Sequence, residues 1–154
     1  MSASRLKGKP LLKINNLPII CHVVKKANEA NVGEVIVATE DREIVDAVES
    51  DGGKAFLTIN HKTGTDRIYE GLKKLKSKDV DYVINLQGDE PMINPIDIIN
   101  LNNLMNKSNS DIGTLAAEIK EDSTFKNENI VKVITKEKLN NKNFTEALNF
   151  FRKN

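Results

Sequence analysis

Short apolar runs alternate with amphipathic helical patterns along this chain, and this alternation constrains its fold more than any other feature. The apolar runs with the length of strands lie at 35–38, 56–57, 82–86, 114–119 and 130–134. Apolar residues at helical spacing lie at 19–27, 44–48, 68–75 and 96–104. Strands and helices that alternate at this spacing predict an α/β fold, with a mostly parallel sheet covered by helices on both faces.

Composition narrows the class of protein without indicating a function. The 154 residues are enough for one domain with a real core, and 23 basic against 22 acidic residues leave a formal net charge of +1. This balance argues against a nucleic-acid partner held by a basic face. No apolar run is long enough to span a membrane and no signal peptide is evident, so we expect a cytoplasmic protein without a membrane partner.

The cysteine and the histidines indicate little chemistry. Cys21 is the only cysteine, which excludes an internal disulfide, and its place in a helical pattern predicts a packing role. His22 and His61 are the only histidines, so a histidine metal site is not expected.

The segment 85–91, with the sequence NLQGDEP, is the first candidate for a functional site. It follows an apolar run, so we expect Asp89 and Glu90 where a strand leaves the sheet. Ligands of open α/β sheets bind beyond the carboxyl ends of the strands, and an aspartate there can hold a magnesium ion that bridges substrate phosphates. Glycine, aspartate and proline are also common turn residues, so this segment alone leaves an ordinary turn as the alternative.

The N-terminal segment 1–10, MSASRLKGKP, has the small and basic residues of an anion-binding loop. Backbone N–H groups in such a loop can surround phosphates, while Arg5 and Lys9 neutralise their charge. It is not a Walker A loop, because Ala3 stands at the first glycine position and Pro10 at the serine or threonine position. A solvated basic terminus is the alternative.

A third polar segment, HKTGTDR at 61–67, opens the helical pattern at 68–75. Thr63 or Thr65 can cap this helix, and such an N-terminus attracts anions or the polar edges of rings. An ordinary capping loop is the alternative to a binding role.

Taken together, the three motifs resemble one family. SASRLKGKPLL, HKTGTDR and NLQGDEPMI are similar to segments of 3-deoxy-manno-octulosonate cytidylyltransferase, also called CMP-Kdo synthetase. VIVATEDREIVDAVESDGG and NENIVKVIT support the resemblance, which extends to about Thr135 and returns more weakly at 147–152. It implies a Rossmann-like nucleotide-diphospho-sugar transferase fold, with residues 1–154 as a single partial domain.

The resemblance implies an enzyme that joins CTP to the sugar acid Kdo and releases pyrophosphate. Its product, CMP-Kdo, serves lipopolysaccharide synthesis in Gram-negative bacteria. The resemblance also implies Mg²⁺ as the cofactor and a homodimer for a complete member of the family. Because the anomeric hydroxyl of the sugar attacks the α-phosphorus as pyrophosphate leaves, the site must neutralise charge and align the reactants.

The resemblance also assigns nucleotide-binding residues. Arg5 and Lys9 match basic positions of the phosphate-binding loop. Thr65 and Arg67 match a segment near the cytosine, in which Thr63 replaces the usual serine.

Further matches concern catalysis and the sugar. Asp89 matches the carboxylate that holds magnesium, and Lys9 joins it as the second expected catalytic residue. Gln87 matches a position that faces the ribose or the sugar, so it is assigned to nucleotide and substrate binding. Arg152 aligns with an arginine that meets the carboxylate of Kdo.

The sequence departs from the family's pattern at both ends. The family has an apolar strand ending in an Ile-Pro-Ala-Arg-like segment ahead of the position of Met1. After the position of Arg152 it has a second metal-binding aspartate near a VDTPED-like motif. Neither occurs in this sequence. We therefore expect the central first strand and the C-terminal part to be missing, which leaves the strands around Val35 and Val83 without a neighbour.

Two hypotheses from different classes remain. In the first, the chain is a cytidylyltransferase whose chemistry works in the complete protein or together with a partner segment. In the second, it is a truncated, non-catalytic nucleotide-binding remnant of that enzyme. Because the first strand and the second metal-binding aspartate are missing, we predict that residues 1–154 alone are catalytically silent and poorly stable. A Rossmann dehydrogenase is disfavoured, because no G-x-G-x-x-G follows a strand.

Overall fold

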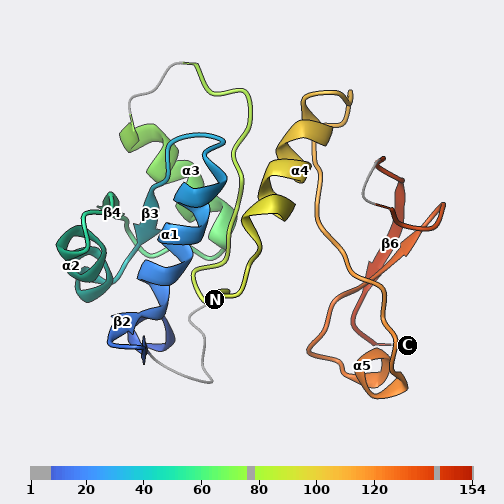
Figure 1. The fold of residues 1–154 in the computed structure, drawn as a ribbon, viewed down its shortest axis with the longest axis horizontal. Helices are drawn as coiled ribbons and strands as arrows, with labels where there is room; N and C mark the ends of the chain where they lie inside the picture. Colours follow the sequence, from blue (N-terminus) through green and yellow to red (C-terminus); the bar gives the residue numbers. More distant parts are fainter. Residues whose placement is uncertain (1–7, 76–78, 141–142, 154) are drawn as a thin grey trace. The chain divides into compact units, whose positions relative to one another are not determined.

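The computed structural model describes residues 8–75, 79–140 and 143–153 (Figure 1). The chain divides into two compact units, Met1–Ile96 and Asp97–Asn154, here called unit 1 and unit 2. Each unit has helices and strands of its own. The single domain expected over residues 1–154 stays a prediction.

Unit 1 contains the alternating strands and helices that the sequence pattern predicts. Its elements are, in chain order, η1 (Lys9–Leu11), β1 (Lys13–Ile14), β2 (Leu17–Pro18), α1 (Ile19–Ala30), β3 (Val37–Thr39), α2 (Arg42–Ser50), β4 (Ala55–Leu57) and α3 (Gly64–Leu75). Figure 1 shows α1, α2 and α3 gathered around β3 and β4. The three helices and this strand pair confirm the prediction, with bounds shifted by a few residues.

The core of unit 1 lies between α1, α2 and the parallel pair β3–β4. Val37 pairs with Ala55 and Thr39 with Leu57, and α2 connects the two strands. The buried residues of this core are Ile20, Cys21, Val24, Ile44, Val45, Val48 and Ala55. A parallel pair joined by a helix is the basic unit of the α/β class, which confirms the predicted fold class.

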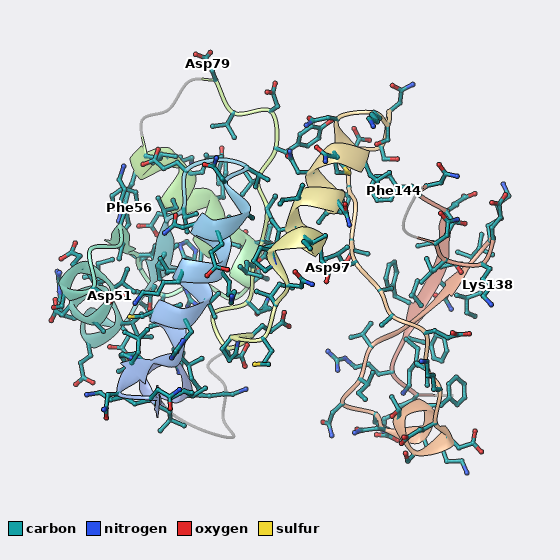
Figure 2. The ribbon with its side chains drawn as sticks, viewed as in Figure 1. Asp51, Phe56, Asp79, Asp97, Lys138 and Phe144 are labelled. Atoms are coloured by element: carbon teal, nitrogen blue, oxygen red, sulfur yellow. The ribbon has the colours of Figure 1, made fainter. Side chains whose placement is uncertain are left out.

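Cys21 has the packing role that the sequence predicts. Its side chain is buried in this core, and its Sγ donates a hydrogen bond to the carbonyl oxygen of Ala47 at 3.6 Å. Burial raises the pKa of the thiol, and the carboxylate of Asp51, which directly follows α2 (Figure 2), raises it further. The reactive thiolate is therefore disfavoured at neutral pH.

Local chemistry explains how two helices are placed on the strands. Asp41 caps α2, because its Oδ1 accepts a hydrogen bond from the N–H of Glu43 at 2.9 Å. The third helix, α3, approaches β3 at Gly71, where an added Cβ would lie 3.0 Å from the Cβ of Ala38. Glycine at this position lets the helix lie close to the strand.

The prediction of a strand at 82–86 is wrong. Residues 79–94, here called the connecting segment, contain no strand, and Tyr82, Val83 and Ile84 are 39%, 48% and 36% exposed. The described residues form three two-stranded sheets, all elsewhere, and only β3–β4 is parallel. The expected mostly parallel sheet is therefore a single parallel pair. An apolar run forms a strand only where a neighbouring backbone takes up its N–H and C=O groups.

Unit 2 is built around an antiparallel hairpin. Its elements are α4 (Pro95–Met105, which begins at the boundary between the units), α5 (Asp122–Lys126), β5 (Lys132–Thr135) and β6 (Ala147–Phe151). The helix expected at 96–104 and the strand expected at 130–134 are confirmed. The strand expected at 114–119 is wrong, because these residues form no ladder with any part of the described chain. Among the described helices, none is both long and apolar enough to cross a bilayer.

Candidate functional site

Gly8, Lys9 and Pro10 form a tight turn on unit 1. Gly8 has a φ of 76°, in the left-handed region that favours glycine, and its carbonyl oxygen accepts a hydrogen bond from the N–H of Leu11 at 2.8 Å. The ring of Pro10 fixes its own φ and restricts the backbone of Lys9 before it. Because η1 contacts α1 and α2, the turn that carries Lys9 is attached to the core of unit 1.

Lys9 and Asp89 form an ion pair between residues 80 positions apart in the sequence. Lys9 Nζ lies 2.7 Å from Asp89 Oδ2, and the two side chains are 44% and 42% exposed. An exposed pair of this kind contributes at most about 1 kcal/mol to stability, so its partners are easily exchanged. The structure therefore brings together the two residues expected to be catalytic.

The turn around Gly88 positions Asp89. The N–H of Glu90 donates to the carbonyl oxygen of Gln87 at 3.3 Å, which closes the turn. An added Cβ at Gly88 would lie 2.9 Å from Cδ1 of Ile20 in α1, so glycine lets the turn lie against this helix. The ordinary-turn alternative and the site prediction are thus compatible, because the turn itself presents the carboxylate.

The donor set around Asp89 fits a magnesium ion when phosphate shares the coordination. Within the described residues, no three His, Cys, Asp or Glu side chains lie close enough together to hold a metal ion. Magnesium is commonly bound by one or two carboxylates together with substrate phosphates and water. Asp89 supplies one such carboxylate, and Lys9 beside it supplies a charge for phosphate.

Thr63 is the residue that caps α3. Its Oγ1 accepts a hydrogen bond from the N–H of Asp66 at 3.1 Å and donates to Asp66 Oδ2 at 2.6 Å. Of the two threonines able to cap this helix, the structure selects Thr63. Thr65 lies exposed in the first turn.

Arg67 lies at the carboxyl ends of the parallel strands. Its Nη2 is 3.2 Å from Oε2 of Glu40, the residue after β3. The Nε of Arg67 and the Oγ1 of Thr58, the residue after β4, are buried without a hydrogen-bond partner among the described residues. Buried polar atoms are normally paired, so two unpaired ones at this edge of the strands suit a polar ligand.

Of the two remaining nucleotide-binding residues, the structure describes only Gln87. This residue is exposed in the turn that precedes Asp89. Arg5 lies outside the described residues.

A cluster that sequence reasoning did not identify joins the loop after β4 to α3. Glu70 accepts hydrogen bonds from His61 Nε2 at 2.6 Å and from the N–H of Ile59 at 3.1 Å, and it lies 2.7 Å from Lys74 Nζ. Hydrogen bonds to the carboxylate lower the pKa of Glu70 from 4.5 to about 2, and the bond from Lys74 has the largest effect, before that from His61. The spacing of Glu70 and Lys74 on one helical face is visible in the sequence, whereas the contact with His61 is not.

Arg152, in unit 2, directly follows β6. Its Nη1 donates to the carbonyl oxygen of Asn129 at 2.7 Å. Lys132, which is only 3% exposed, donates through Nζ to the carbonyl oxygens of Asn127 at 2.8 Å and Arg152 at 2.6 Å. Both residues line a hollow of about 250 Å³ that also contains Phe125, Lys126, Glu128 and Lys153. Four cationic side chains against one carboxylate make this hollow basic.

Unit 1 contains a parallel βαβ unit, and two polar atoms that are unpaired among the described residues lie beyond the carboxyl ends of its strands. These features are typical of the α/β class, whose members bind ligands at the carboxyl ends of their strands. A family model described as Cytidylyltransferase matches residues 1–154, and the chain belongs to that family. The family expected from the three motifs is confirmed.

Relatives of known name refine the comparison. The 3-deoxy-manno-octulosonate cytidylyltransferase of Afipia carboxidovorans is 46% identical over 136 residues, which cover 87% of this chain and 55% of the relative. The protein of the same name from Thermodesulfovibrio yellowstonii is 46% identical over 139 residues, which cover 86% and 54%. A solved structure of CMP:2-keto-3-deoxy-manno-octonic acid synthetase complexed with CTP matches with a TM-score of 0.78 and 37% identity, covering 97% of this chain and 59% of that one. The chain spans about half the length of the relatives it matches.

Proposed function

We propose that this chain forms the nucleotide-binding part of a 3-deoxy-manno-octulosonate cytidylyltransferase, which joins CTP to Kdo and releases pyrophosphate. The observation that carries the proposal is the Lys9–Asp89 ion pair, because it places a cation suited to phosphate 2.7 Å from a carboxylate suited to magnesium. The names of the relatives and the CTP bound to the solved neighbour support the two substrates. The product, CMP-Kdo, would serve lipopolysaccharide synthesis.

The reaction forms one bond to phosphorus and breaks another. The anomeric hydroxyl oxygen of Kdo attacks the α-phosphorus of CTP, the bond to the bridging oxygen of pyrophosphate breaks, and the hydroxyl proton is released. Lys9 neutralises phosphate oxygens and holds the triphosphate in line for attack. Asp89 would hold Mg²⁺, which when bound supplies positive charge for the triphosphate and for the leaving pyrophosphate.

Nucleotide binding exchanges the partners of the ion pair. In the free chain the ammonium of Lys9 and the carboxylate of Asp89 neutralise each other. With the nucleotide bound, Lys9 pairs with a phosphate oxygen, and the carboxylate of Asp89 becomes available as a ligand. The exchange costs little, because an exposed ion pair is worth at most about 1 kcal/mol.

The other assigned residues bind further parts of CTP and Kdo. Thr65 and Arg67, at the start of α3, serve the cytosine, and Arg5 adds charge at the phosphates. Gln87 serves the ribose or the sugar. Arg152 pairs with the Kdo carboxylate, for which the two-pronged guanidinium is well suited, and the basic hollow around it supports binding of an anion. A cytoplasmic homodimer is part of the same proposal and rests on the resemblance.

Titration calorimetry of the full chain with CTP, with and without Mg²⁺, tests the proposal. We expect CTP to bind, and to bind more tightly when Mg²⁺ is present. Pyrophosphate release from CTP and Kdo then separates the two hypotheses. Binding with turnover indicates an active enzyme, and binding without turnover indicates a nucleotide-binding piece that needs other segments or has lost its activity. A folded chain that does not bind CTP contradicts the proposal.

A further inference from the structure

We infer that Glu70, together with His61 and Lys74, positions the loop after β4 and the start of α3 for the base of the nucleotide. The inference rests on the proposed function and extends it to residues that have no role in the reaction as described above. Glu70 acts through the elements that it holds and not on the substrate. It is therefore a positioning residue.

The Glu70 carboxylate joins three donors from two elements. Its Oε2 accepts hydrogen bonds from His61 Nε2 at 2.6 Å and from the N–H of Ile59 at 3.1 Å, and its Oε1 lies 2.7 Å from Lys74 Nζ. Lys74 Nζ also donates to the carbonyl oxygen of Leu57, the last residue of β4. The side chains of His61 and Glu70 are only 18% and 20% exposed. Hydrogen bonds to an ionised carboxylate are stronger than neutral ones, and partial burial strengthens them further.

Alternate residues of the loop are anchored to α3. Leu57 is held by Lys74, and Ile59 and His61 by Glu70, while the next alternate residue, Thr63, caps the helix through Asp66. The loop is therefore attached to α3 at four points, through backbone groups of Leu57 and Ile59 and through the side chains of His61 and Thr63.

Two unpaired polar atoms lie on the elements that this cluster holds. Thr58, whose buried Oγ1 has no partner among the described residues, stands between the anchored residues Leu57 and Ile59. Arg67, whose buried Nε is likewise unpaired, precedes Glu70 by one turn of α3. A loosened loop would let both atoms turn to water. The cluster keeps them in place for the donors and acceptors on the edge of a base.

Replacement of Glu70 by glutamine tests the inference, because Glu70→Gln preserves the size of the side chain and removes its charge. Calorimetry with Mg²⁺ gives the dissociation constants of the full chain for CTP and for inorganic tripolyphosphate, which has no base. We expect the constant for CTP to rise about tenfold, the effect of a lost hydrogen bond to a charged group, and that for tripolyphosphate to be unchanged. Lys9→Ala should raise both constants.

Matched variants separate positioning from folding. Glu29 pairs with Lys26 at 2.8 Å on the exposed side of α1, so Glu29→Gln removes the same charge elsewhere on unit 1 and should change neither affinity. His61→Gln keeps the Glu70 charge and removes one contact, so it should weaken CTP alone and by less than Glu70→Gln does. Thermal unfolding identifies the variants that fold. If Glu70→Gln does not fold, the CTP and tripolyphosphate affinities of His61→Gln test whether the cluster positions the loop.

Three outcomes overturn the inference. Unchanged CTP affinity in folded Glu70→Gln overturns it and leaves the proposed function standing. Equal losses for CTP and tripolyphosphate overturn it as well, because they indicate a general loosening of the chain. Failure of the unaltered chain to bind CTP overturns the proposed function and the inference together.

Discussion

Two apolar runs of similar character behave in opposite ways within unit 1. The run at 35–38 leads into β3, pairs with β4 and packs against helices, whereas the run at 82–84 is exposed in the connecting segment. The backbone neighbour makes the difference. The N–H of Val37 donates to the carbonyl oxygen of Lys54 at 2.9 Å, and the carbonyl oxygen of Thr39 accepts from the N–H of Thr58 at 2.7 Å. Apolar composition selects candidate strands, and a hydrogen-bonding neighbour decides which of them form.

The end of the connecting segment nevertheless has defined contacts with the rest of unit 1. Gly88 lets the turn lie against Ile20, and Asp89 reaches Lys9. The βαβ region is thus stabilised by burial, and the segment by a turn and an exposed ion pair. Substitutions in the first region should change stability, and those at the end of the segment should change ligand binding.

The largest expected effect compares a buried and an exposed valine. Val45 is 2% exposed, so Val45→Asp buries an unpaired carboxylate at a cost of several kcal/mol, and we expect unit 1 to unfold. Val83→Asp should change the free energy of unfolding by less than about 0.5 kcal/mol. Urea denaturation followed by circular dichroism measures both. Equal destabilisation by the two variants would break the comparison.

Asp89→Asn should separate binding from stability in the connecting segment. A neutral amide is a poor magnesium ligand, so we expect Mg²⁺-dependent CTP affinity to fall about 100-fold, at least as much as the loss of an outer-shell partner of a metal site. The unfolding temperature should barely change, because the exposed pair with Lys9 contributes little. Calorimetry and thermal unfolding measure the two effects.

The control for this variant is Asp79→Asn, at the other end of the same segment. Figure 2 shows Asp79 directed away from the helices of unit 1. Its replacement should leave CTP affinity unchanged. Normal Mg²⁺-dependent CTP binding by folded Asp89→Asn would contradict the metal assignment.

Lys9→Ala should have a smaller and more selective effect. The lost partner is a triphosphate and not a base, so CTP should bind about tenfold more weakly while cytidine is little affected. Lys13→Ala, which removes an exposed lysine from β1, is the matched control. Equal weakening of CTP and cytidine, measured by calorimetry, would mean that Lys9 does not contact phosphate.

The smallest expected effect concerns the loop after β4, which ionic contacts hold. The pKa of Glu70 is about 2 in the folded chain and 4.5 ordinarily, so its contribution to stability is complete above about pH 4.5 and is lost as the pH falls toward 2. The unaltered chain should therefore unfold at a higher temperature than Glu70→Gln at neutral pH, and the difference should narrow across this window. The range from about pH 5 to about pH 2 spans the unfolded and folded pKa values of Glu70. A difference in unfolding temperature that stays constant across this range would contradict the lowered pKa of Glu70.

Prediction from the sequence succeeded where the signal is local. The helices α1, α2, α3 and α4 each carry apolar residues at helical spacing, and their existence was predicted with only their bounds shifted. Lys9 and Asp89 were selected from motifs whose residue types suit phosphate and magnesium, and the structure brings them together, while their roles at the site stay predictions. The strand β6 and the cluster around Glu70 were missed, because each depends on contacts between separate elements that a local pattern does not show.

The sequence by itself determined the family and the α/β class, since three motifs and the alternation of strands with helices are legible along the chain. Only the tertiary structure decided that the run at 35–38 leads into a paired strand and the run at 82–86 does not. It also decided that Lys9 meets Asp89 across 80 residues and that His61 meets Glu70. The physical reason is that strand pairing and ion pairing depend on which distant groups lie within hydrogen-bonding distance, and a local pattern does not encode that distance.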